Sequence, residues 1–88
     1  MTQAAAYVIV PRVVTSNGIG ARIREARETA GMRQVRLAAD TGLALNTIRN
    51  YELNLTAQSI ENLRLIADVL DVDVLWLIDG DRVGEEVA

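Results

Sequence analysis

Apolar residues recur at helical spacing through the middle of the chain. Between residues 19 and 30 the apolar positions are separated by four, three and four residues, which places them on one face of an α-helix: Ile19, Ile23, Ala26 and Ala30. A second stripe of this kind runs from Ile60 to Leu70. The spacing therefore predicts two amphipathic helices, each with one side turned toward a core.

Glycines divide the chain between these two helices. Gly31 is placed to end the first helix, because glycine adopts the left-handed conformation that commonly closes a helix. Residues 34–41 form a second short helical segment, which Gly42 ends, and residues 45–53 form a third.

The last two helices have side chains suited to begin them. Ser59 precedes the fourth helix, and its hydroxyl can accept a hydrogen bond from a first-turn N–H group. Asp73 can cap a final turn, VLWLI, which Gly80 closes. The pattern predicts an all-α fold of five short helices over residues 18–80.

The two ends of the chain differ from this pattern. Residues 7–15, YVIVPRVVT, are rich in β-branched residues and favour an extended conformation, with Pro11 restricting them to an edge strand or a strand interrupted by a bulge. We therefore expect residues 1–17 to form an N-terminal arm. Residues 81–88 form an acidic tail with little to bury, which we expect to fray.

The arm is the part of the chain with two open interpretations. No other segment has the pattern of a partner strand, so the arms of two chains can pair as an antiparallel ribbon through Val8 and Val10. Such a ribbon would add to a dimer interface that also uses Leu75 and Trp76. The alternative is a disordered or loosely packed arm.

Composition excludes several kinds of chemistry. The chain has no cysteine and no histidine, which removes disulfides, thiolate metal sites and the commonest general base. We therefore expect no enzymatic activity, no metal, no cofactor and no small-molecule ligand. The apolar run from Ala4 to Val10 is far too short to span a bilayer, so no membrane association and a cytoplasmic location are expected.

Charge is distributed unevenly along the chain. The net charge of −3 taken alone argues against binding to nucleic acid. Residues 1–58, however, hold seven arginines and four acidic residues (+3), whereas residues 59–88 hold two arginines and eight acidic residues (−6). This asymmetry predicts one basic face and one acidic end.

The spacing between residues 37 and 51 is typical of a helix-turn-helix. Ala38 is small enough to allow close crossing of two helices, and Gly42 supplies the positive φ that the turn requires. Leu43, Ile48 and Tyr51 would anchor the second of these helices, which leaves its opposite face free for the major groove of DNA.

With these residues in register, the chain resembles the Cro/lambda-repressor-type helix-turn-helix family, also called the XRE family. The resemblance runs from Ile19 to Gly80, and its most specific segments are RQVRLAADTG, LALNTIRNYE and the closing WLIDG. It implies a five-helix, lambda-repressor-like DNA-binding domain that acts as a homodimer on a two-fold operator in double-stranded DNA.

The resemblance also implies a set of DNA-binding residues. Five of them fall on the groove-facing positions of the third helix, and these are Leu45, Asn46, Thr47, Arg49 and Asn50. Asparagine can bond adenine, arginine can bond guanine, and leucine can pack on a thymine methyl group. The alternatives are phosphate contact or solvation for the arginine, packing for the leucine, and ordinary exposure for the asparagines.

The resemblance also implies residues that hold the third helix in place and residues that contact DNA phosphates. Gln34 would bond a phosphate and buttress the third helix, while Arg27 and Glu52 match a buried ion pair between the first and third helices. Arg33 stands where a capping serine or threonine is usual, and with Arg36 it can contact phosphates.

Two further features depart from the family pattern. The third helix begins after Ala44, which also lacks a capping oxygen, and the loop LNLTAQS carries no basic residue. Phosphate contacts there would fall to Asn54, Thr56 and Gln58, with Arg22 and Arg24 as further candidates.

These observations favour a sequence-specific transcription regulator, of the kind found in phage-type repressors and Cro-like switches. Restriction–modification controllers, which NLTAQSIENL resembles in part, and antitoxin-like regulators are alternatives. Another alternative, from a different class, is a protein-interaction module that retains the fold and binds DNA weakly.

Overall fold

The computed structural model describes residues 18–80, and all regular secondary structure in this range is helical. A first helix covers residues 18–29, and four more follow it: α2 (Gln34–Thr41), α3 (Leu45–Glu52), α4 (Ile60–Leu70) and α5 (Val74–Asp79). The all-α prediction is confirmed, and α3 ends one residue earlier than its pattern predicted. The predicted arm and tail lie outside the described residues. No helix in residues 18–80 is both long and apolar enough to cross a membrane.

The turns form where the sequence placed glycine and capping side chains. Gly31 and Gly42 have φ values of 72° and 79°, in the left-handed region that glycine adopts without a steric penalty. The Ser59 hydroxyl accepts a hydrogen bond from the Asn62 N–H, and the Asp73 carboxylate accepts one from the Leu75 N–H. These two contacts begin α4 and α5 as predicted.

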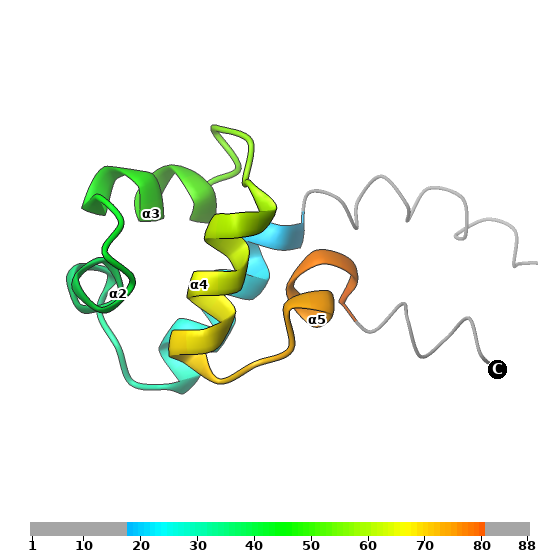
Figure 1. The fold of residues 1–88 in the computed structure, drawn as a ribbon, viewed down its shortest axis with the longest axis horizontal. Coiled ribbons are helices and arrows are strands. Elements are labelled where there is room, and N and C mark those ends of the chain that lie inside the picture. The colour runs from blue at the N-terminus through cyan, green and yellow to red at the C-terminus, as the bar shows by residue number, and fades with distance from the viewer. Residues whose placement is uncertain (1–17, 81–88) are drawn as a thin grey trace, which may run out of the picture.

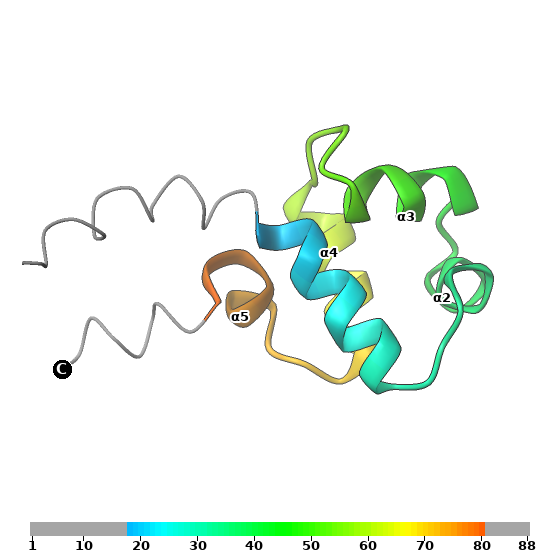
Figure 2. The same cartoon turned by 180° about the vertical axis from the view of Figure 1, so that it is seen from behind.

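One aliphatic core joins the five helices. Its largest completely buried side chains are Ile23, Leu37, Ile48, Leu63, Ile66 and Leu77. They come from every helix in the described range, so each short helix depends on its neighbours for burial rather than on its own helical propensity. Figures 1 and 2 show α2 and α3 at one end of this part of the molecule, α5 at the other, and α4 between them.

Arg22 fastens α5 to the first helix. Its Nε atom donates to the Leu77 carbonyl oxygen at 2.9 Å, and its Nη2 atom donates to the Ile78 carbonyl oxygen at 2.9 Å. These carbonyls lie in the last turn of α5, where a positive charge also complements the helix dipole. Arg22 is therefore used within the fold, whereas the sequence had offered it as a phosphate contact.

Gly20 sets the distance between the first helix and the end of α3. A Cβ atom at this position would collide with the carbonyl oxygens of Tyr51 and Glu52. Its N–H group also donates to the Asn54 side-chain oxygen at 3.2 Å. The absence of a side chain at Gly20 thus allows the close approach that brings the first helix to α3.

We expect Gly20→Ala to lower the free energy of unfolding by about 1–3 kcal/mol, the usual cost of overpacking. The loss should appear even though alanine is favoured over glycine inside a helix by roughly 1 kcal/mol. Chemical denaturation of the purified protein measures it. Ala21→Ser is the control, because Ala21 is exposed on the same helix and an added atom there meets solvent, so its effect should stay within about 0.5 kcal/mol. Equal stability of the two variants would contradict the close approach.

Candidate DNA-binding interface

The turn between α2 and α3 positions the predicted reading helix. The Gly42 N–H donates to the Ala38 carbonyl oxygen at 2.9 Å and closes α2. Ala38 is buried and Leu43 packs against the core beside it. Two residues of α3, Ile48 and Tyr51, are buried in the core. Because these anchors occupy one side of α3, its other side faces solvent.

The predicted base-reading residues divide into two groups on this helix. Asn46 and Arg49 are exposed, whereas Leu45, Thr47 and Asn50 are half-buried. Leu45 packs against the hydrophobic core, which is the alternative that the sequence had left open for it. The exposed polar surface of α3 is therefore centred on Asn46 and Arg49.

The arginines around α2 and α3 also divide into two groups. Arg36 bonds Asp40 at 2.8 Å, and Arg24 bonds Glu28 at 3.0 Å, both one helical turn apart. Within residues 18–80, the side chains of Arg33 and Arg49 are exposed and have no hydrogen-bond or ion-pair partner. Their guanidinium groups are available to an anion without breaking an internal contact.

The first turns of α2 and α3 lack side-chain caps. Arg33 and Ala44 occupy the N-cap positions, and neither accepts a hydrogen bond through its side chain. The first N–H groups of each helix consequently have no side-chain acceptor, and the helix dipole makes such ends favourable to negative charge. The expectation that both caps are missing is confirmed.

Arg27 and Glu52 form a buried ion pair between the first helix and α3. The Arg27 Nε and Nη2 atoms donate to the two Glu52 carboxylate oxygens at 2.7 and 3.0 Å. Only 11% of the Arg27 side chain and 4% of the Glu52 side chain are exposed. The hydrogen bonds to Glu52 raise the pKa of Arg27, and they outweigh the opposing effect of burial.

Two further contacts complete this pair. The Arg27 Nη1 atom donates to the Met32 carbonyl oxygen at 2.9 Å. The Gln34 side-chain amide donates to a Glu52 oxygen at 3.0 Å, which ties the start of α2 to the end of α3. Gln34 thus buttresses the reading helix. An open hollow of about 410 Å³ lies beside the pair, and its lining residues are Arg24, Arg27, Gln34, Arg49, Glu52 and Leu53.

The loop after α3 uses most of its polar side chains internally. The Asn54 side-chain oxygen accepts from the Gly20 N–H and from the Gln58 amide, which also donates to the Tyr51 carbonyl oxygen. Asn54 and Gln58, proposed from the sequence as phosphate contacts, therefore stabilise the loop. Leu55 in this loop is 67% exposed, which the apolar pattern did not predict.

Tyr51 connects α3 to the start of α4 through its hydroxyl group. The oxygen accepts hydrogen bonds from the Asn62 side chain at 2.9 Å and the Ser59 N–H at 3.3 Å. Burial raises the pKa of Tyr51, whereas these hydrogen bonds lower it. Their combined effect is the larger, so the pKa of Tyr51 lies below its usual value. The sequence indicated Tyr51 as an apolar anchor and did not reveal this second role.

Two short helices that cross at a tight turn on a buried frame, with the outer side of the second helix in solvent, define a helix-turn-helix DNA-binding domain. The chain belongs to the helix-turn-helix family of DNA-binding transcription regulators, whose family model matches residues 23–77. Among solved structures, the N-terminal DNA-binding domain of SinR from Bacillus subtilis matches with a TM-score of 0.69 and 36% sequence identity. This match covers 72% of the present chain and 93% of the SinR domain. Comparison with curated proteins gives no match.

We expect Arg27→Ala to lower the free energy of unfolding by roughly 3–5 kcal/mol, because it leaves the Glu52 carboxylate buried without its partner. Thermal and chemical unfolding measure the change. Arg24→Ala serves as the control: it removes an exposed pair within one helix and should cost less than about 0.5 kcal/mol. An unfolding midpoint that is the same in both variants would show that the buried pair does not support the fold.

Proposed function

We propose that the protein represses transcription as a homodimer that binds a two-fold operator, in the manner of phage-type repressors and Cro-like switches. The observation that carries this proposal is the solvent-facing side of α3, with Asn46 and Arg49 exposed opposite the buried Ile48 and Tyr51. An eight-residue helix held in this way can enter the major groove and place its first turns against base edges.

Asn46 is the residue proposed to read a base most directly. It is exposed in the first turn of α3, and its amide group can donate to and accept from adenine at the same time. Arg49 lies one turn further along and can bond guanine or a phosphate. Asn50 and Thr47 are half-buried, and we assign them contacts at the margin of the interface.

Phosphate contact is proposed to come from α2 and the start of α3. Arg33 carries an unpaired guanidinium group beside the uncapped first turn of α2, so a side-chain cation and main-chain N–H groups face the same anion. Arg36 can add to this contact by exchanging Asp40 for a phosphate. These groups place the positive charge on the helices that flank the reading surface.

The dimer is proposed to use α5, which lies at the end of the molecule away from α2 and α3 (Figure 1). Leu75 in this helix is 53% exposed, which leaves an apolar side chain for a second copy to cover. Successive major grooves on one face of DNA are about 34 Å apart. A dimer with its two-fold axis at α5 would have to hold its two α3 helices at this separation. Of the other predicted dimer contacts, Trp76 is half-buried next to Leu75 in α5, and Val8 and Val10 lie outside the described residues.

We expect Asn46→Ala to weaken binding to a selected operator by about 1–3 kcal/mol, which is roughly 5- to 150-fold in the dissociation constant. The operator would first be obtained by selecting bound sites from random duplexes with the purified protein. Affinity for random DNA should stay almost unchanged, because a base contact contributes little to non-specific binding. Equal losses on both DNAs would exclude Asn46 as a base-reading residue.

We expect Arg33→Ala to reduce the slope of log affinity against log salt concentration by about 0.9, the value for one lost phosphate contact. Arg64→Ala is the matched control, since Arg64 is an exposed arginine on α4, outside the helix pair. Titration of operator binding with salt measures both variants. If the DNA affinity of the unmodified protein does not depend on salt, the result would instead favour a protein-interaction module. The exposed side chains of Leu53 and Leu55 are the observation that supports this alternative.

A further inference from the structure

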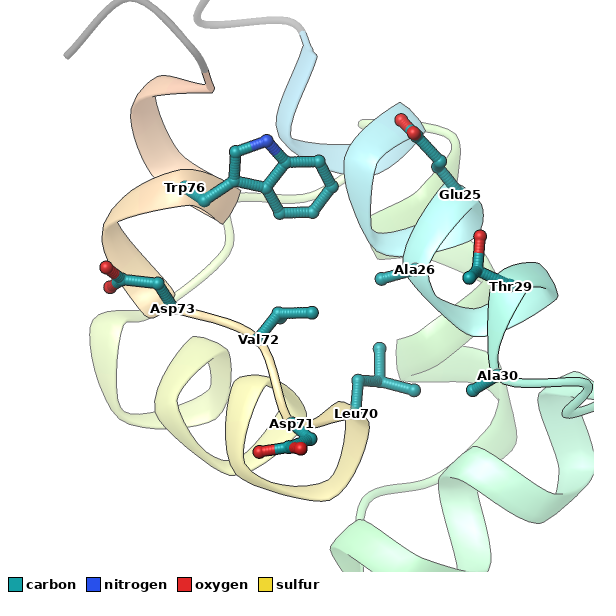
Figure 3. Close-up of a pocket in the computed structure, with 9 residues that line it drawn as sticks. All are labelled: Glu25, Ala26, Thr29, Ala30, Leu70, Asp71, Val72, Asp73 and Trp76. Atoms are coloured by element: carbon teal, nitrogen blue, oxygen red, sulfur yellow. The ribbon is translucent and has the colours of Figure 1, made fainter. Parts of the chain in front are cut away.

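An apolar groove lies between the first helix and the segment that joins α4 to α5 (Figure 3). Its volume is about 580 Å³, within the range of pockets that bind ligands. The apolar side chains that line it are Ala26, Ala30, Leu70, Val72 and Trp76. Figure 3 shows the indole ring of Trp76 extending from α5 toward the first helix, where it stays half-buried. Part of the core is therefore left open at this face.

The rim of the groove is acidic. Glu25, Asp71 and Asp73 line it together with Thr29. No arginine within residues 18–80 pairs with any of these three carboxylates, although the described range contains four ion-pair contacts elsewhere. A segment that fits both the apolar lining and the acidic rim must carry apolar side chains and at least one positive charge.

The two terminal segments of the chain differ in whether they meet this requirement. Residues 7–14, YVIVPRVV, contain aliphatic and aromatic side chains with Arg12 among them, and residues 1–17 include no acidic residue. Residues 81–88 contain three acidic residues and one arginine, so the carboxylates of the rim would repel them. We propose that residues 7–14 occupy this groove in the same chain, with Arg12 against the acidic rim.

The length of the connection permits this docking. Gly18 begins the described part of the first helix, and Ala26 lies eight residues further on, about 12 Å along the axis. Once residues 15–17 have made a reversal of direction, residues 12–14 can run back along the first helix, and they span about 10 Å when extended. Arg12 can therefore come close to Ala26 and to the rim of the groove at Glu25. The chain must reverse direction between Thr15 and Gly18, and the sequence TSNG is rich in residues that favour turns.

Docking within one chain gives the arm a role different from a ribbon shared by two chains. It would cover the exposed part of Trp76 and make that side chain part of the core of each protomer. Leu75, the next residue in α5, would remain exposed for a second copy. An intermolecular ribbon formed by the arms would instead leave the groove open.

The 88-residue chain allows a direct test, because Trp76 is its single tryptophan. We expect nuclear Overhauser effects between the indole protons of Trp76 and the methyl groups of Val8, Val10, Val13 or Val14. A mixed sample of isotope-labelled and unlabelled chains separates contacts within a chain from contacts between chains. Contacts that persist within the labelled chain support the proposal. Contacts found only between chains, or no contacts at all, overturn it.

Charge exchange provides a second test on the full chain. Arg12→Glu should shift the fluorescence emission of Trp76 to longer wavelength and increase its quenching by acrylamide, because the ring becomes more exposed. Glu25→Arg should act in the same direction, and the double variant Arg12→Glu/Glu25→Arg should restore most of the original signal. Arg82→Glu is the matched control, and it should leave the emission unchanged.

The result that would overturn the charge assignment is equally specific. If Arg12→Glu and Arg82→Glu give the same emission and quenching as the unmodified protein, Arg12 does not hold the arm at the rim. A change in Arg12→Glu that the double variant fails to reverse also rejects the pairing with Glu25. Unfolding curves of all variants verify that the helical core is intact in each.

Discussion

The buried pair between Arg27 and Glu52 is the interaction on which the geometry of this domain depends. It connects the last turn of the first helix to the last residue of α3, and the Gln34 side chain brings the start of α2 to the same carboxylate. Removing water from two charges is costly, so the pair is retained only with full hydrogen bonding and a fixed arrangement. That arrangement orients α3 relative to the rest of the fold. Gly20 makes it possible, because the two helices meet without a side chain between them.

Internal pairing of arginines matters for the proposed interface, because the net charge of the protein is −3. Several arginines are committed to internal contacts: Arg27 to Glu52, Arg22 to the end of α5, and Arg24 and Arg36 to carboxylates on their own helices. Within residues 18–80 the side chains of Arg33, Arg49 and Arg64 have no internal partner, and the first two lie on the helix pair. The number of arginines thus matters less for DNA binding than the number without an internal partner.

The two ends of the described part differ in their chemistry. The end with α2 and α3 has free guanidinium groups and uncapped helix termini, which suit an anionic partner. The end with α5 has an acidic rim around an apolar groove, which suits a segment that is apolar and basic. The two surfaces share the aliphatic core but have no lining residue in common. Arm docking at one end and DNA binding at the other can therefore be tested by separate variants.

The sequence alone determined the helices, their turns and the family. Periodic apolar residues, Gly31, Gly42, Ser59 and Asp73 act through local backbone geometry, which is why their positions could be read directly from the chain. The Arg27–Glu52 pair was also anticipated, through a family resemblance rather than through any local pattern.

Only the tertiary structure decided which polar side chains are free. Arg22 and Asn54 looked available for DNA, but they bond carbonyl and N–H groups that lie far away in the sequence. Gly20 stands inside a helical pattern, a signal that could have pointed to close packing, yet the opposing carbonyls at Tyr51 and Glu52 are unknown before folding. The groove beside Trp76 likewise arises from two segments, residues 25–30 and 70–76, that lie far apart in the sequence. Local patterns specify helices, whereas the partners of long polar side chains depend on how those helices pack.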